Sequence, residues 1–204
     1  MYLPPQFAEP RAEELHRIVH DNPLGMLVTH TATGLEANHL PFLLDAEQGL
    51  LVAHVARANP IWREVANGDA VLVVFRGAHG YVSPNWYPSK HETHRRVPTW
   101  NYEVVHAHGS IHVHDDEKAV RGIVARLTRR HEAALPQPWK MSDAPAEYLE
   151  QTLAQIVGIE VHLTRLEGKR KLNQHHDARD REGAIQGLED SGNASLAQAM
   201  RNAS

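Results

Sequence analysis

The run Ala53-His54-Val55-Ala56-Arg57-Ala58-Asn59-Pro60-Ile61-Trp62 decides how the chain is interpreted. Its apolar first half predicts a strand that ends at Arg57. A helix is predicted to follow, because asparagine is a good N-cap and proline suits the first helical position. A helix start offers unpaired N–H groups and partial positive charge, so with Arg57 beside it this run suits a phosphate. The same residues fit an ordinary strand–turn–helix with a surface arginine, and both interpretations stay open.

Strand patterns dominate the chain around this run, and helix patterns come mainly later. The predicted strands cover residues 24–30, 35–44, 50–56, 70–76, 100–114 and 158–166. Helices are predicted over 9–20, over 59 to about 67, over 178–189 and over 194–200. Two more are predicted between these: one is capped at 115 or 116 and ends near 131, and the other begins at 142. Residues 77–99 and 169–176 predict irregular loops. This order indicates the α+β class, with an antiparallel sheet or barrel rather than an alternating parallel sheet.

Composition narrows the class of protein further. The 204 residues carry a net charge of −4 and include no cysteine, which excludes disulfides, thiolate metal sites and cysteine nucleophiles. An acidic balance argues against a general nucleic-acid binder. The first residues lack the pattern of a signal peptide, and no apolar stretch is long enough to span a membrane, so we expect a cytoplasmic protein.

Sixteen histidines invite a metal hypothesis. His106, His108, His112 and His114 alternate with apolar residues and therefore share one face of a predicted strand. A stable site needs three or four converging ligands, and neither a His-Glu-x-x-His helix nor another complete ligand pattern is present. We predict no metal, and interpret these residues as a polar sheet face. Dinucleotide-binding, P-loop and serine-hydrolase motifs are absent as well.

Three further segments have residues suited to ligand binding. Trp100-Asn101-Tyr102 begins a strand directly after the predicted long loop, where an aromatic ring meets a ligand or a partner subunit. In His39-Leu40-Pro41-Phe42 the proline removes a ladder donor and predicts a strand edge or a bulge. Lys171, Asn173 and Gln174 combine a cation with amides, which suits a phosphate or a flavin edge. Core packing, an edge strand and a solvated loop are the respective alternatives.

In combination, these segments resemble one family, the PaiB-type FMN-binding negative transcriptional regulators of the FMN-binding split-barrel fold. The resemblance extends from residue 1 to about 174. The motifs that carry it, in order, are Met1-Tyr2 with Pro4 and Phe7, His39-Leu40-Pro41-Phe42, Ala53 to Pro60, Tyr81-Val82-Ser83-Pro84, Trp86-Tyr87, Val97-Pro98-Thr99-Trp100-Asn101-Tyr102 with His106, and Lys171 with Gln174.

The resemblance implies an antiparallel split β-barrel with flanking helices, over residues 1–176, and a helical tail packed on it over 177–204. It also implies a homodimer with FMN in two clefts between the subunits. The isoalloxazine and ribityl chain would lie along Asn38, His39, Leu40, Pro41, His54 and Val55, and the phosphate at Arg57 and Asn59. Trp100, Asn101, Lys171 and Gln174 would close the site, some of them from the other subunit.

One motif departs from the family pattern. The family carries Lys-x-Ser-Gln-Asn near its C-terminal loop, whereas this chain has Lys171-Leu172-Asn173-Gln174-His175. Both replacements are polar and keep the capacity for hydrogen bonds at this end. Function stays open among a regulator that acts through DNA or a protein partner, a flavin-dependent oxidoreductase or flavin reductase, and an FMN carrier or sensor. The acidic charge and the lack of a basic recognition helix do not support direct DNA binding.

Overall fold

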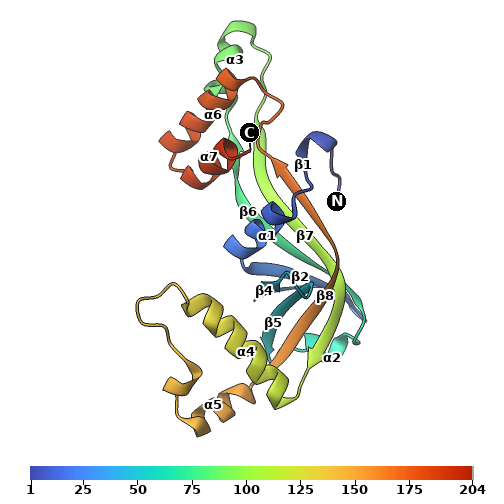
Figure 1. The fold of residues 1–204 in the computed structure, drawn as a ribbon. Helices are drawn as coiled ribbons and strands as arrows, with labels where there is room; N and C mark the ends of the chain where they lie inside the picture. The colour runs from blue at the N-terminus through green and yellow to red at the C-terminus, as the bar shows by residue number, and fades with distance from the viewer. Residues whose placement is uncertain (204) are drawn as a thin grey trace. The chain divides into compact units, whose positions relative to one another are not determined.

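The computed structural model describes residues 1–203, which divide into two compact units. The terminal unit combines Met1–Asp21, Arg76–Val105 and the segment from Glu167 onward, and the central unit combines Asn22–Phe75 and His106–Leu166. Three long strands, β6 (Ala70–Val82), β7 (Thr99–His114) and β8 (Ile156–Lys171), contribute residues to both units. Figure 1 shows these three strands in the ribbon of the chain.

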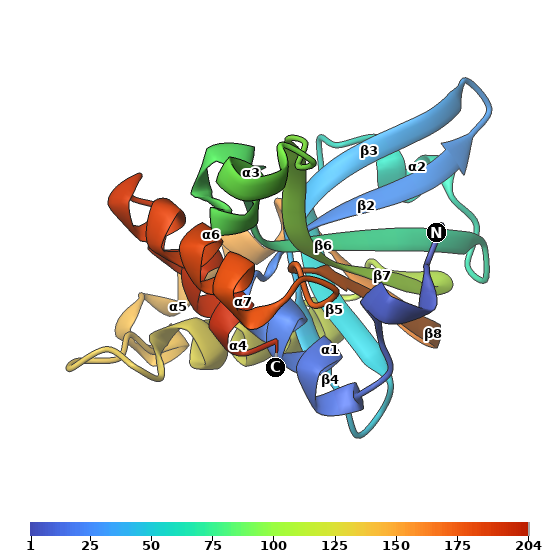
Figure 2. The same cartoon turned by 90° about the horizontal axis from the view of Figure 1, so that it is seen from above.

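The central unit is built on an antiparallel sheet. β2 (Leu24–Thr31) pairs with β3 (Gly34–Pro41) and with β6, while β5 (Leu50–Ala56) pairs with β4 (Leu43–Asp45) and with β8. The strand order is β3-β2-β6-β7-β8-β5-β4. β3 and β5 also contact each other although four strands lie between them in this order, so the sheet curls on itself. The hairpin β2–β3 is seen along its length in Figure 2.

Alternation explains how β7 packs in this unit. His106, His108 and His112 on the opposite face are only partly buried, whereas Ala107 and Ile111 are fully buried, as the sequence pattern predicts. Between them, Gly109 lies so close to β8 that a Cβ atom there would be 2.3 Å from the backbone oxygen of His162. Glycine is therefore needed for the close approach of these two strands.

Helices flank the sheet of the central unit. α4 (Glu117–Glu132) begins at Asp116, whose side chain accepts a hydrogen bond from the Ala119 amide at 2.9 Å. Its apolar stripe, including Ile123 and Leu127, packs with Val52 of β5. The other helices are the single turn α2 (Ile61–Glu64), the 3₁₀ turn η3 (Met141–Asp143) and α5 (Ala146–Leu153).

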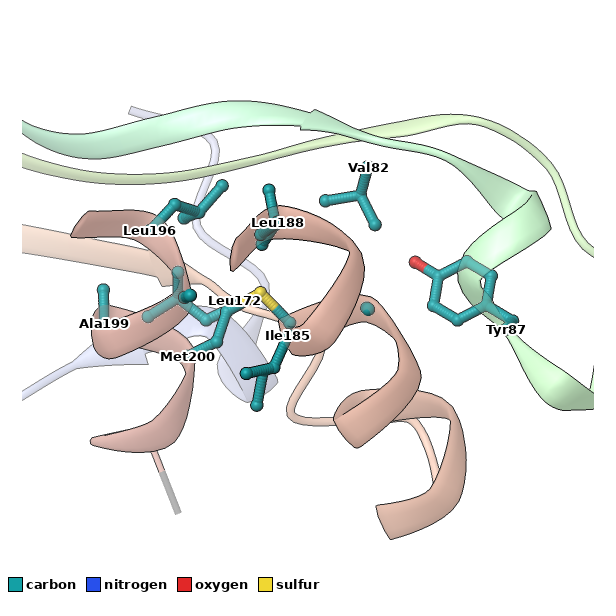
Figure 3. Close-up of a cluster of buried hydrophobic side chains, with 10 residues drawn as sticks. Val82, Tyr87, Leu172, Ile185, Leu188, Leu196, Ala199 and Met200 are labelled. Atoms are coloured by element: carbon teal, nitrogen blue, oxygen red, sulfur yellow. The ribbon is translucent and has the colours of Figure 1, made fainter. Parts of the chain in front are cut away.

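The terminal unit contains the first and last helices. It begins with the 3₁₀ turn η1 (Pro5–Phe7), the short strand β1 (Ala8–Glu9) on β8, and α1 (Ala12–Asp21). The 3₁₀ turn η2 (Pro84–Trp86) and α3 (Pro88–Thr93) follow β6, and α6 (Ala178–Asp190) and α7 (Ala194–Arg201) end the described chain. Figure 3 shows the apolar cluster on which α6 and α7 pack, which includes Tyr87, Leu172, Leu188, Leu196 and Met200.

Several predicted element bounds were wrong. The predicted strand over 35–44 breaks at Phe42 into β3 and β4, and the helix after Asn59 ends at Glu64 rather than near 67. Residues 77–99 are not an irregular loop, because β6 continues to Val82 and α3 forms after it. The predicted polar loop from Lys169 is strand up to Lys171, since Arg170 is buried there. The helix expected from Ser142 is a 3₁₀ turn followed by α5.

The tail after residue 176 packs within the terminal unit. α6 and α7 contact each other, and α6 also contacts η2 and α3. The predicted boundary between a domain over 1–176 and a tail over 177–204 stays a prediction, and Ser204 lies outside the described residues. Within the described part of the chain, none of the helices combines the length and the apolar character that crossing a membrane requires.

Candidate functional site

An amide pair joins β3 to the segment after β5 in the central unit. Asn59 Nδ2 donates to Asn38 Oδ1 at 2.7 Å, and Asn59 Oδ1 accepts from the Ile61 amide at 3.0 Å. Asn59 therefore caps the first turn of α2, as the sequence indicates, although the helix begins one residue later than predicted. Both asparagines are partly exposed, so the remaining capacity of their amides is open to a ligand.

His54 is a half-buried imidazole on β5 with an open nitrogen. Its Nδ1 atom is shielded from solvent and has no hydrogen-bond partner within residues 1–203. Burial lowers the pKa of His54 below its ordinary value, so the ring is neutral at pH 7. A second buried polar atom of this unit, Thr29 Oγ1 on β2, also has no partner in the described chain. Such orphaned atoms are costly unless something satisfies them.

Arg57 is engaged by other residues of the central unit, and its contact with a phosphate stays a prediction. Its Nε donates to the Ala154 carbonyl at 2.6 Å and its Nη2 to the Ile156 carbonyl at 3.3 Å. The same Nη2 lies 2.6 Å from a carboxylate oxygen of Asp115. The guanidinium thus stabilises the end of α5 and is neutralised by Asp115, partners that lie far along the chain. A phosphate would have to compete with them.

A second arginine near this turn has no such partner. The Arg63 guanidinium lies 4.3 Å from the centre of the Trp62 ring, and the Trp62 indole donates to the Arg57 carbonyl at 3.0 Å. Arg63 is exposed and pairs with no carboxylate in the described chain. Sequence reasoning missed Arg63, and its place three residues after Pro60, in the first turn of the predicted helix, is the signal that could have found it.

The predicted ligand-binding residues of β3 and β5 divide between two faces. Successive side chains of a strand alternate, so Asn38 and Leu40 point to the opposite face from His39 and Pro41. Leu40 and Val55 are core residues, 7% and 2% exposed. Their side chains therefore cannot all meet one ligand. Of this group, Asn38 and His54 are the partly buried residues with polar side chains.

The other four predicted residues belong to the terminal unit. Trp100 is half exposed and stacks on His79, with ring centres 6.1 Å apart, whereas Asn101 is fully buried with its Nδ2 on Met200 Sδ. Gln174 is bonded at both ends within its own turn, to the Leu172 amide and the Arg170 carbonyl. Lys171 Nζ donates to Thr99 Oγ1 at 2.5 Å and to the Trp100 carbonyl at 3.0 Å. Lys171 lines a cavity of about 430 Å³ in this unit, and the other three do not take part in its lining.

Comparisons with known proteins agree on one family. A family model described as "Putative FMN-binding domain" matches residues 1–165. An uncharacterised protein of Aspergillus fumigatus is 35% identical over 237 residues, covering 93% of this chain and 91% of its own. Protease synthase and sporulation protein PAI 2 of Bacillus subtilis is 30% identical over 200 residues, covering 97% and 94%.

A solved structure confirms the predicted fold class. The FAD and heme binding protein from Mycobacterium smegmatis superposes with a TM-score of 0.60 at 18% identity, over 87% of this chain and 79% of that chain. The antiparallel sheet with flanking helices therefore has the split-barrel arrangement of flavin-binding proteins, as expected.

Proposed function

Because the chain belongs to the FMN-binding domain family, which also confirms the resemblance seen in its motifs, we propose that it holds FMN in the central unit where β3 contacts β5. The observation that carries this location is the buried Nδ1 atom of His54, which has no partner within residues 1–203. The Asn38–Asn59 amide pair adds polar groups on the same two chain segments. When bound, the flavin supplies one- or two-electron redox chemistry.

The side chains at this place fit the flavin's chemistry. A flavin edge carries both donors and acceptors, and the neutral ring of His54 can act as either. The amides of Asn38 and Asn59 have the same versatility. For the phosphate, we propose Arg63 as the cation, because it has no carboxylate partner in the described chain. Arg57 would contribute less, because Asp115 already offsets its positive charge.

We further propose that the protein is a homodimer through the outer face of the β2–β3 hairpin. The register pairs Leu24 with Pro41, Met26 with His39, Val28 with Ala37 and His30 with Leu35, so these side chains share one face. Leu24 and Leu35 are 62% and 74% exposed. Exposed apolar faces of this kind mark interaction sites, and a second copy is the occupant that the family resemblance implies.

For the role of the flavin, redox chemistry is better supported than direct DNA binding. The helix pair α6–α7, joined by Ser191-Gly192-Asn193, has the form closest to a helix-turn-helix. Arg201 in this pair is bonded to Glu182 and Glu189. A DNA-reading helix carries excess positive charge, whereas acidic residues outnumber basic ones here: Asp180, Glu182, Glu189 and Asp190 against Arg179, Arg181 and Arg201.

Anaerobic mixing of the FMN-loaded protein with NADH or NADPH tests this role. We expect the flavin absorbance to bleach as the ring is reduced, with free FMN at the same concentration as the control. An unbleached spectrum would contradict a reductase. It would favour a regulator that acts through a protein partner, or a carrier without turnover. A cytoplasmic location stays a prediction.

His54→Phe tests the place of the cofactor. We expect at least about a tenfold loss of FMN affinity, because a lost hydrogen bond to a buried group is worth about 1.4 kcal/mol. The apoprotein should melt no lower than wild type, since the variant removes a buried atom that has no partner. Fluorescence titration of the apoprotein gives the affinity. The exposed His131→Phe is the matched control, and equal affinities for the two variants would refute the assignment.

A further inference from the structure

The terminal unit contains a cavity of about 430 Å³ that the proposed FMN site does not use. Phe7, Val97 and Pro98 form an apolar part of its wall. The volume lies within the range of pockets that bind small molecules. The cavity is therefore large enough for a ligand of several heavy atoms and too small for a protein segment with its side chains.

The charged side chains that line this cavity are all cations. Arg95, Arg96 and Lys171 take part in the lining, and no carboxylate does. Lys171 Nζ is bonded only to neutral oxygens, those of Thr99 and of the Trp100 backbone. Arg95 is exposed and pairs with no carboxylate in the described chain.

Arg96 is the one lining cation with an acidic partner. Its Nη2 lies 2.5 Å from the carboxylate of Asp180, which is fully buried, and its Nε donates to Ser89 Oγ at 2.8 Å. One carboxylate therefore offsets one of three cations, and the cavity keeps an excess of positive charge. Such an excess attracts an anion and disfavours a cation.

Two of the residues that line the cavity have a buried polar atom without a partner in the described chain. Asn173 is fully buried, holds its backbone in the left-handed region at φ 63°, and donates from Nδ2 to the Tyr87 hydroxyl at 2.9 Å. Its Oδ1 has no partner among residues 1–203, and neither has Nδ1 of His176. Burial, and then neighbouring cations, lower the pKa of His176, so its ring is neutral at pH 7 and can donate as well as accept.

We propose that this cavity binds the oxyanion of a small molecule, a phosphate or carboxylate group, with Lys171 and Arg95 supplying charge and Asn173 and His176 supplying hydrogen bonds to the neighbouring atoms. The ligand is distinct from the FMN of the central unit. A cofactor phosphate is the competing source of the same chemistry, because the family resemblance includes Lys171. This proposal does not depend on the place proposed for FMN, and a separate experiment tests it.

The test uses the full-length protein with inorganic phosphate and, separately, acetate as probes. Line broadening in phosphorus NMR and the rise in melting temperature measure the affinity, with and without saturating FMN. We expect Lys171→Met to weaken binding at least about tenfold, since a hydrogen bond from a charged group is worth about 1.5 kcal/mol or more. Arg95→Ala should weaken it about threefold, because its exposed charge is screened.

Arg76→Ala, an exposed arginine of the same unit outside the cavity, is the control and should leave the affinity unchanged. If Lys171→Met fails to fold, the contrast between Arg95→Ala and Arg76→Ala still decides. Phosphate or acetate binding that persists in the FMN-loaded protein and weakens in Arg95→Ala supports the proposal. Failure of both probes to bind overturns it, and so does release of phosphate by one equivalent of FMN, which would assign the cavity to the cofactor.

Discussion

Arg170→Met is expected to lower the free energy of unfolding by about 3 kcal/mol. Arg170 is 3% exposed and lies at the centre of a buried network in the terminal unit. Its Nε donates to Glu103 at 2.8 Å and its Nη1 to Glu9 at 3.2 Å. Methionine keeps much of the volume but leaves two buried carboxylates with fewer partners, and removing one member of a buried pair typically costs 3–5 kcal/mol.

The low end of that range applies because each carboxylate keeps a second arginine. Glu9 retains Arg11, the main cause of the lowering of its pKa to about 2, and Glu103 retains Arg17 at 3.0 Å. Chemical denaturation of the apoprotein measures the loss. Arg179→Met removes an exposed pair with Glu92 in the same unit and should cost far less. Equal losses for the two variants would mean that the buried network is not what stabilises this unit.

Local patterns predicted the elements whose burial repeats regularly. The alternation from Val105 to Val113 gave the face of β7, and the asparagine cap gave the turn into α2. β8 was predicted too short because Lys169 and Arg170 read as a solvated loop. Both are buried, because distant segments satisfy them: Glu9 and Glu103 pair with Arg170, and the Tyr2 carbonyl accepts from Lys169. Burial of a charge depends on its partner, which no local window contains.

The same limit applies to the candidate site. Asn59 was predictable because its main contact, the Ile61 amide, lies two residues away. The partners of Arg57 lie 97 and 99 residues away, so the sequence could not show that its guanidinium is already engaged. The Lys171 loop was assigned to a ligand from its residue types. The cavity beside it also needs Arg95 and Arg96, from a segment predicted to be irregular.

The proposed dimer would cover the outer face of the β2–β3 hairpin. On this face Leu35, Ala37 and Val28 present apolar side chains, whereas Glu36, Asn38 and Leu40 lie on the opposite face of β3. Burying apolar surface contributes about 25 cal/mol per Å², and a stable interface buries roughly 1,200 Å² or more in total. A charge placed in its middle would be desolvated without a partner.

Ala37→Arg is therefore expected to convert the dimer to a monomer, with the sedimenting mass falling from about twice 22.9 kDa to 22.9 kDa. Two symmetry-related copies would bring two new arginines toward one face, so repulsion adds to desolvation. Glu36→Arg, one residue earlier on the other face, is the control and should stay dimeric. If the second subunit completes the FMN site, as the family resemblance implies, Ala37→Arg should also lose FMN affinity while its apoprotein stays folded. Wild-type protein that sediments as a monomer with FMN bound would refute both the dimer and its shared site.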